Sequence, residues 1–196
     1  MLLPGMMYAA DRRETMEHFR SVGRTSELPI MIYNNPVSYK VDVTPQMFAE
    51  LADIEAFVAL KESSDDPRRV TDIHNEVGDR YQIFTGVDNL ALESLMLGAV
   101  GWVAGLVVAF PHETVAIYNL AQQGRYAEAL EIYRWFMPML HLDVSTKLVQ
   151  NIKLAEVIAG VGTETVRPPR LSLVGEERDH VIRVVEEAIA NRPELP

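Results

Sequence analysis

The sequence predicts an α/β fold: five strand-helix units that form a parallel sheet, followed by a helical region. Short apolar runs alternate with longer amphipathic segments from residue 1 to about residue 124. After that point the strand-like runs cease, whereas the helical periodicity continues to the end of the chain. Strands that alternate with helices imply parallel pairing through right-handed crossovers. We therefore expect two domains, residues 1–124 and residues 125–196.

The five expected strands are short, and polar or glycine residues end most of them. An Asn-Asn-Pro turn follows the second strand, and Thr85-Gly86 follows the fourth. Such residues interrupt extended backbone and favour turns. The strands are residues 1–7, Pro29–Tyr33, Phe57–Leu60, Tyr81–Phe84 and Gly101–Val107.

The helices between these strands carry apolar residues at helical spacing and begin at capping residues. Thr44 and Asp66 each precede a proline, an arrangement typical of a helix start, and we expect Asp65 and Asp88 to cap helices as well. The expected helices are residues 12–24, 44–52, 66–78, 88–98 and 111–124.

Three further helices are expected in the second domain, at residues 126–136, 145–160 and 176–190. We expect Pro138 to end or kink the first of them. Residues 162–175, which contain two adjacent prolines, are expected to form an extended connector.

Composition excludes several classes of function. A formal charge of −10 without a basic cluster argues against a nucleic-acid partner. The absence of cysteine excludes disulfides and thiolate metal sites, and the five histidines show no metal-binding spacing. No apolar run is long enough to span a bilayer, and no signal-peptide core is visible. We expect a cytoplasmic protein without a metal site.

Lys61 stands out because it closes an apolar strand just where a polar turn begins. Lysine is seldom buried without a partner, and desolvation favours the neutral, nucleophilic amine. The residue is therefore a candidate for forming a Schiff base. The alternative is a lysine that buries its aliphatic stem and lifts its charge into solvent.

Two other strand ends favour the catalytic interpretation. The carboxyl ends of parallel strands meet at one edge of the sheet, where active sites of α/β proteins lie. Tyr33 ends the second strand, and its phenol can relay a proton; Gly86 follows the fourth and allows close approach to the backbone. The alternatives are a rim tyrosine and a turn glycine.

These residues lie in segments that resemble a known family. Tyr-Asn-Asn-Pro at residues 33–36, Leu-Lys-Glu-Ser at residues 60–63 and the segment 85–101 are similar to the dihydrodipicolinate synthase and N-acetylneuraminate lyase superfamily, class I aldolases built on a (β/α)8 barrel. In that family the tyrosine and the imine-forming lysine lie about 28 residues apart, and here they are 28 residues apart. The resemblance spans essentially the whole chain.

The resemblance implies a lyase in which Lys61 condenses with the 2-oxo group of an acid such as pyruvate while Tyr33 shuttles a proton. No cofactor is implied beyond this covalent imine. Gly86 and Val103 match positions that line the family's pocket. Homo-oligomers are common in the family, so we expect one here.

One departure concerns the substrate. Dihydrodipicolinate synthases carry an arginine two residues after the proline of the tyrosine motif, where it holds the carboxylate of the aldehyde substrate, and here that position is Ser38. Serine cannot form a bidentate clamp. The substrate-binding position Ser38 therefore argues against the lysine-biosynthesis reaction. The Tyr-Asn-Asn-Pro segment and the Lys-Glu-Ser-Ser-Asp-Asp segment at residues 61–66 look more like the catabolic branches of the family, which include dehydratases of 2-keto-3-deoxy sugar acids and a deaminase of hydroxyproline breakdown.

The other departure concerns length. The family barrel has eight strands, and this sequence accounts for five; the Gly-Thr-Thr-Gly-Glu motif that binds the substrate carboxylate in the family does not occur. We expect an N-terminally truncated chain, and open sheet edges should make it poorly stable or make it self-associate. A monodisperse monomer that melts cooperatively in solution would contradict this expectation. A catalytically inactive remnant, serving as a binding or scaffold module, is the alternative to the lyase.

Overall fold

The computed structural model describes residues 1–103 and 105–196. The chain divides into two compact units, Met1–Val103 and the residues that follow. Helix α6 (Pro111–Gln122) therefore groups with the helices after it. The predicted domain of residues 1–124 was defined by strand-helix units rather than by compactness, and it stays a prediction.

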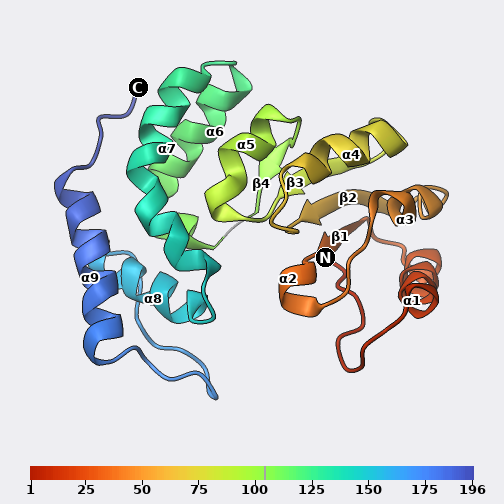
Figure 1. Ribbon diagram of the computed structural model, residues 1–196, viewed down its shortest axis with the longest axis horizontal. Coiled ribbons are helices and arrows are strands. Elements are labelled where there is room, and N and C mark those ends of the chain that lie inside the picture. The colour runs from red at the N-terminus through yellow and green to blue at the C-terminus, as the bar shows by residue number, and fades with distance from the viewer. Residues whose placement is uncertain (104) are drawn as a thin grey trace. The chain divides into compact units, whose positions relative to one another are not determined.

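A parallel sheet forms the centre of the first unit. Its strands β1 (Ile30–Asn34), β2 (Phe57–Glu62), β3 (Gln82–Thr85) and β4 (Gly101–Trp102) lie in chain order, as Figure 1 shows. All three strand pairs are parallel. The predicted α/β class with a parallel sheet is confirmed.

The first predicted strand is wrong in extent. Leu2 makes an isolated parallel bridge to Ile32: its amide donates to Met31 O at 2.8 Å, and its carbonyl accepts from the Tyr33 amide at 2.8 Å. The segment thus reaches the edge of β1 but pairs no further. Pro4 has no amide hydrogen to continue the ladder. Met7 is 87% exposed, so it is not the core residue that a buried strand would require.

The last predicted strand is also shorter than expected. Strand β4 holds two residues, and Leu106–Val108 form the 3-10 turn η2 instead of extended backbone. Gly105 already has helical dihedral angles, which ends the extended run. Residue 104 of the predicted strand lies outside the described residues.

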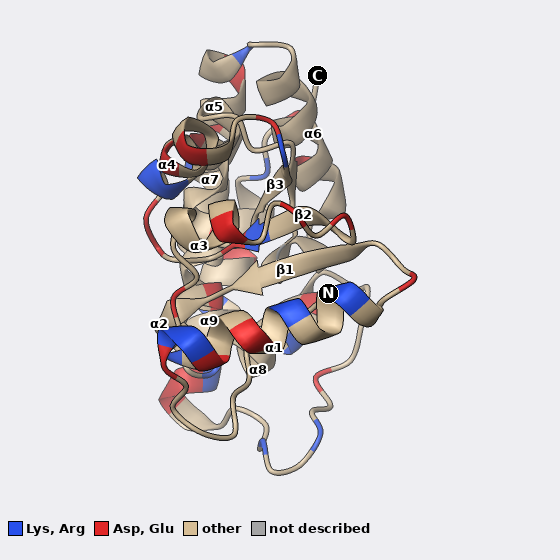
Figure 2. Cartoon of the chain, turned by 90° about the vertical axis from the view of Figure 1, so that its right-hand side faces the viewer, with Lys and Arg blue, Asp and Glu red and all other residues tan. Residues whose placement is uncertain are grey.

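The helices of the first unit pack apolar faces against the sheet. The largest buried side chains include Phe19, Phe48, Phe57, Leu60 and Ile83. The helices are α1 (Arg12–Thr25), α2 (Pro36–Tyr39), α3 (Pro45–Glu50), α4 (Arg68–Val77) and α5 (Ala91–Met96), with the 3-10 turn η1 (Asp88–Leu90) before the last. Figure 2 shows acidic and basic residues interspersed along α1.

The predicted caps have mixed outcomes. Thr44 caps α3, accepting from the Met47 amide at 3.4 Å, and Asp66 accepts from the Arg68 amide at 3.1 Å. Asp65 is exposed and adopts a positive φ of 62°, so it shapes the turn rather than capping. Asp88 lies inside η1, is fully buried and accepts from the Trp102 indole at 3.2 Å. Its burial gives it a packing role that the sequence pattern did not indicate.

The second unit is helical. It contains η2, α6, α7 (Tyr126–Leu140), the 3-10 turn η3 (His141–Val144), α8 (Leu148–Ile158) and α9 (Gly175–Ala190). Helix α6 packs on α7, and α8 packs on α9. Pro138 lies within α7 rather than ending it. The carbonyl that loses its partner belongs to Arg134, which is exposed, so solvent can satisfy it. Among the described residues no helix is long and apolar enough to cross a membrane.

Candidate functional site

The structure brings the two predicted catalytic residues together. Tyr33 and Lys61 are register partners at the carboxyl ends of β1 and β2, and both are half-buried. The Lys61 Nζ lies 4.1 Å from the centroid of the Tyr33 ring. An amine and a phenol therefore share one face of the sheet, where one can act as a nucleophile and the other can move a proton.

The phenol of Tyr33 lies in polar surroundings. Asn35 Nδ2 donates to its oxygen at 3.1 Å, and the Tyr39 ring meets its ring edge-on at a centroid distance of 5.5 Å. Burial raises the pKa of Tyr33, but the hydrogen bond from Asn35 and the positive charge of Lys61 outweigh it, so the pKa lies below its ordinary value. Burial and the neighbouring Tyr33 raise the pKa of Tyr39. Tyr33 is thus the phenol better suited to proton transfer.

Gly86 makes room for the lysine. Its amide donates to the Glu62 carbonyl at 2.9 Å, which extends the pairing of β2 and β3. A Cβ at this position would lie 2.1 Å from Ser63 Oγ and 2.5 Å from Lys61 Cε. The sequence indicated a glycine that lets substrate approach. The structure shows that the lysine side chain itself occupies this space.

The two remaining predicted residues lie at the same end of the sheet. The Val103 amide donates to Thr85 O at 2.9 Å, which continues β4 in the direction of the strand ends. Ser38 is exposed on α2, and its amide donates to Asn35 Oδ1 at 2.9 Å. Because Asn35 also binds the Tyr33 hydroxyl, the backbone at Ser38 is linked to the phenol. Contact of Ser38, Gly86 or Val103 with substrate stays a prediction.

A buried polar network lies directly beside this pair, and the sequence analysis missed it. Asn34 and Glu62 follow Tyr33 and Lys61 in their strands, and they are 1% and 5% exposed. Asn34 Nδ2 donates to Glu62 Oε2 at 3.0 Å and to Asp42 Oδ1 at 3.1 Å. Arg69 closes the network with two hydrogen bonds to the Asp42 carboxylate, each 2.9 Å. The sequence contains a signal for this network, because a polar residue directly follows each catalytic candidate: Asn34 follows Tyr33, and Glu62 follows Lys61.

The pKa values of the two carboxyl groups in the network are shifted in opposite directions. Burial raises the pKa of Glu62, although hydrogen bonds from Asn34 and Ser64 and the charge of Arg69 oppose the shift. Burial also acts on Asp42, but the hydrogen bonds from Arg69 and Asn34 outweigh it and lower the pKa of that carboxyl. The network therefore favours an ionised Asp42 beside a Glu62 that ionises reluctantly.

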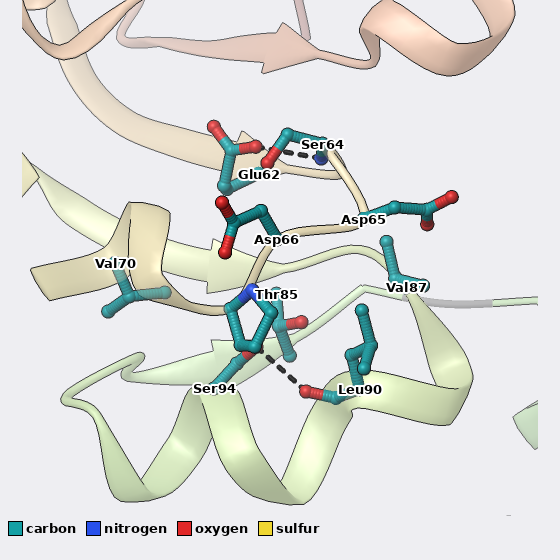
Figure 3. Close-up of a pocket in the computed structure, with 10 residues that line it drawn as sticks. Glu62, Ser64, Asp65, Asp66, Val70, Thr85, Val87, Leu90 and Ser94 are labelled. Atoms are coloured by element: carbon teal, nitrogen blue, oxygen red, sulfur yellow. Dashed lines mark hydrogen bonds between the residues drawn. The ribbon is translucent and has the colours of Figure 1, made fainter. Parts of the chain in front are cut away.

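A small hollow lies on the Glu62 side of the sheet. Figure 3 shows Glu62, with its hydrogen bond from the Ser64 amide, at the rim of this hollow, which extends toward Thr85, Val87 and Leu90. Its volume of about 10 Å³ accommodates roughly one water molecule. Tyr33 and Lys61 do not line it. It is therefore not the place where an organic acid would meet the lysine.

We expect Glu62→Gln to stabilise the protein increasingly as pH rises. Because the folded pKa of Glu62 is raised, its contribution to stability is complete below the pKa of an unfolded glutamate, about 4.3, and is lost as pH rises through the folded value. Glutamine cannot ionise, so the variant escapes this loss. Urea unfolding at pH values from 4 to 8 measures the difference in unfolding free energy. Glu55→Gln, at an exposed position, is the control. A difference that does not change with pH would contradict the expectation.

No group of three or more acidic, histidine or cysteine side chains among residues 1–103 and 105–196 is arranged to hold a metal ion.

A model of the dihydrodipicolinate synthetase family matches residues 3–188. The chain belongs to this family. The resemblance inferred from the tyrosine and lysine segments is thereby confirmed.

Curated members of the family support the same conclusion. The chain is 26% identical over 188 residues to the 4-hydroxy-tetrahydrodipicolinate synthase of Oceanobacillus iheyensis, covering 95% of this chain and 64% of that protein. It is 30% identical over 176 residues to the enzyme of the same name from Methanothrix thermoacetophila, covering 89% and 59%. The chain thus spans about three fifths of the length of these relatives.

Solved structures of the family share the fold. Dihydrodipicolinate synthase from Aquifex aeolicus superimposes with a TM-score of 0.84 at 26% identity, covering 92% of this chain and 62% of that one. The enzyme from Bacillus anthracis gives a TM-score of 0.87 at 24% identity, covering 94% and 63%. These comparisons confirm the predicted partial (β/α)8 barrel.

Proposed function

We propose that this chain carries the imine-forming part of a lyase that acts on a 2-oxo acid. The observation that carries the proposal is the placement of Lys61 Nζ 4.1 Å from the ring of Tyr33 at the ends of two paired strands. Membership of the dihydrodipicolinate synthetase family supports it.

In the proposed reaction the neutral amine of Lys61 attacks the 2-oxo carbon and water leaves, so that an imine replaces the carbonyl. The protonated imine withdraws electrons, which makes bond cleavage at the neighbouring carbons feasible. Tyr33 moves the protons that these steps require, and its lowered pKa suits that role. No other cofactor is needed.

Pyruvate is the 2-oxo acid with which we propose to start. A prophage protein of the family from Escherichia coli K12, whose fold matches with a TM-score of 0.87 at 20% identity, was solved in complex with pyruvate. Pyruvate is also the smallest acid that contains the reacting group, so it tests imine formation without assuming the rest of the substrate.

Ser38 favours a substrate different from that of the synthases. The curated relatives above are named as 4-hydroxy-tetrahydrodipicolinate synthases. Serine in place of the carboxylate-binding arginine argues against that substrate, and the segments at residues 33–36 and 61–66 look more like those of the catabolic branches. We therefore propose a sugar-acid or hydroxyproline-derived substrate and a dehydratase, deaminase or aldolase reaction. The homo-oligomer and the cytoplasmic location stay predictions.

Reduction with borohydride in the presence of pyruvate tests the proposal. Hydride converts the imine to a stable secondary amine, and intact mass reads the adduct. We expect one adduct per chain, absent when either pyruvate or borohydride is left out. A folded sample without an adduct would overturn the proposal and favour the inactive remnant.

A further inference from the structure

The pairing of β1 with β2 changes register partway along the strands. Ile30 is opposite Phe57, but the next residue, Met31, is opposite Ala59. Val58 is therefore an extra residue in β2. Two strands with such an irregularity lack uniform main-chain pairing. Their main-chain hydrogen bonds alone therefore do not fix which residues are opposite each other.

The register downstream of this irregularity decides whether the catalytic pair exists. Successive side chains of a strand point to opposite faces, so a slip by one residue exchanges the faces. Tyr33 would then be opposite Leu60 or Glu62 instead of Lys61. Main-chain hydrogen bonds can form in any of these registers, so the side chains, among them the buried pair Ile32 and Leu60, must supply the preference.

The side chains of Asn34 and Glu62 supply such a preference. They are the last register pair of the two strands, and Asn34 Nδ2 donates to Glu62 Oε2 at 3.0 Å. Both groups are almost wholly buried. A slip would separate them and leave a buried amide and a buried carboxyl without each other, which is costly away from water.

Asn34 is also held from the other side. Its Oδ1 accepts from the Val43 amide at 2.9 Å, in the segment that leads into α3. Its Nδ2 also donates to Asp42, which Arg69 of α4 binds through two hydrogen bonds. The amide of Asn34 is thus fixed by the loop after β1 and by the helix after β2, so it cannot follow β2 if that strand slips.

We propose that Asn34, through its hydrogen bond to Glu62, is a positioning residue that sets the register in which Tyr33 faces Lys61. The inference rests on the proposed function for its catalytic consequence. Its structural part, the approach of the phenol to the ammonium, can be measured without substrate.

The test compares Asn34→Leu with wild type and with Asn75→Leu. Leucine has nearly the shape of asparagine but neither donates nor accepts hydrogen bonds, and it adds no charge. Asn75 is exposed on α4 and lies outside the network, so it serves as the matched control. The two readouts are the rate of borohydride-trapped adduct formation with pyruvate and the titration of Tyr33, followed by NMR of ring-labelled tyrosine.

We expect Asn34→Leu to trap pyruvate at least about tenfold more slowly than Asn75→Leu. The pKa of Tyr33 should rise, because the phenol loses its proximity to the positive charge of Lys61. Equal trapping rates and equal Tyr33 titrations in the two variants would overturn the inference. If wild type forms no adduct, the proposed function fails, and the Tyr33 titration alone then decides the register.

A second pair of variants keeps the inference testable if Asn34→Leu does not fold. Glu62→Gln keeps a side-chain oxygen that accepts from Asn34 Nδ2, whereas Glu62→Leu removes the acceptor. Glu62→Leu should trap pyruvate more slowly than Glu62→Gln and lose the lowered Tyr33 pKa. Equal trapping rates and equal Tyr33 titrations in these two variants would overturn the inference.

Discussion

Replacing Lys61 with arginine should abolish the reduced pyruvate adduct, a loss of at least about 100-fold. Arginine keeps the positive charge near the Tyr33 ring, and with it most of the electrostatic contribution to the fold. Its guanidinium does not lose its proton in proteins, so it cannot supply the neutral amine that attacks a carbonyl. Intact mass after borohydride treatment measures the effect, and circular dichroism confirms the fold.

Lys40→Arg is the matched control for this prediction. Lys40 lies in the loop between α2 and α3, and it is exposed, with its Nζ bound to the Val37 carbonyl at 2.7 Å. It should trap pyruvate as wild type does. An adduct of undiminished yield in Lys61→Arg would show that another amine reacts, and the assignment of the nucleophile would be wrong.

Replacing Tyr33 with phenylalanine should separate imine formation from proton transfer. The ring that packs against Tyr39 remains, but the hydroxyl that accepts from Asn35 is lost. General acid-base catalysis contributes about 100- to 10,000-fold to proton transfer. We expect exchange of the methyl protons of pyruvate into deuterated water to fall by at least about 100-fold, while a borohydride adduct still forms at Lys61.

Tyr39→Phe controls for the removal of a hydroxyl from this cluster. Its phenol has a raised pKa and lies beside Tyr33, so it is close enough to report a general disturbance of the rings. Methyl-proton exchange should stay within about threefold of wild type in this variant. If Tyr33→Phe exchanged protons as fast as Tyr39→Phe, Tyr33 would not be the proton shuttle.

The sequence was sufficient to predict the features that depend on strong, local patterns. Alternating apolar and amphipathic segments predicted the parallel sheet, and the end of the third expected strand placed Lys61 at its rim. Since parallel strand ends meet at one edge, the sequence alone places Tyr33 and Lys61 at the same edge of the sheet. Their 28-residue separation then indicated the family.

Other features depend on partners that are distant in the sequence. The network of Asn34, Asp42, Glu62 and Arg69 needs the exact register of two strands and the placement of α4, which periodicity does not give. Residues 1–7 looked like a strand because they are apolar, but a strand needs hydrogen-bonding partners, and Pro4 interrupts the ladder. Gly86 was interpreted as a turn or a substrate-facing glycine, whereas its close approach to Lys61 became visible only in three dimensions.

Peptide mapping of the borohydride-reduced pyruvate adduct is the most direct test of the central claim that Lys61 is the imine former. The chain has four lysines, Lys40, Lys61, Lys147 and Lys153, so the site of modification can be assigned without ambiguity. We predict that the adduct lies on the peptide containing Lys61, with none of comparable yield at the other three. An adduct distributed over the other lysines, or none at all in folded protein, would contradict the claim.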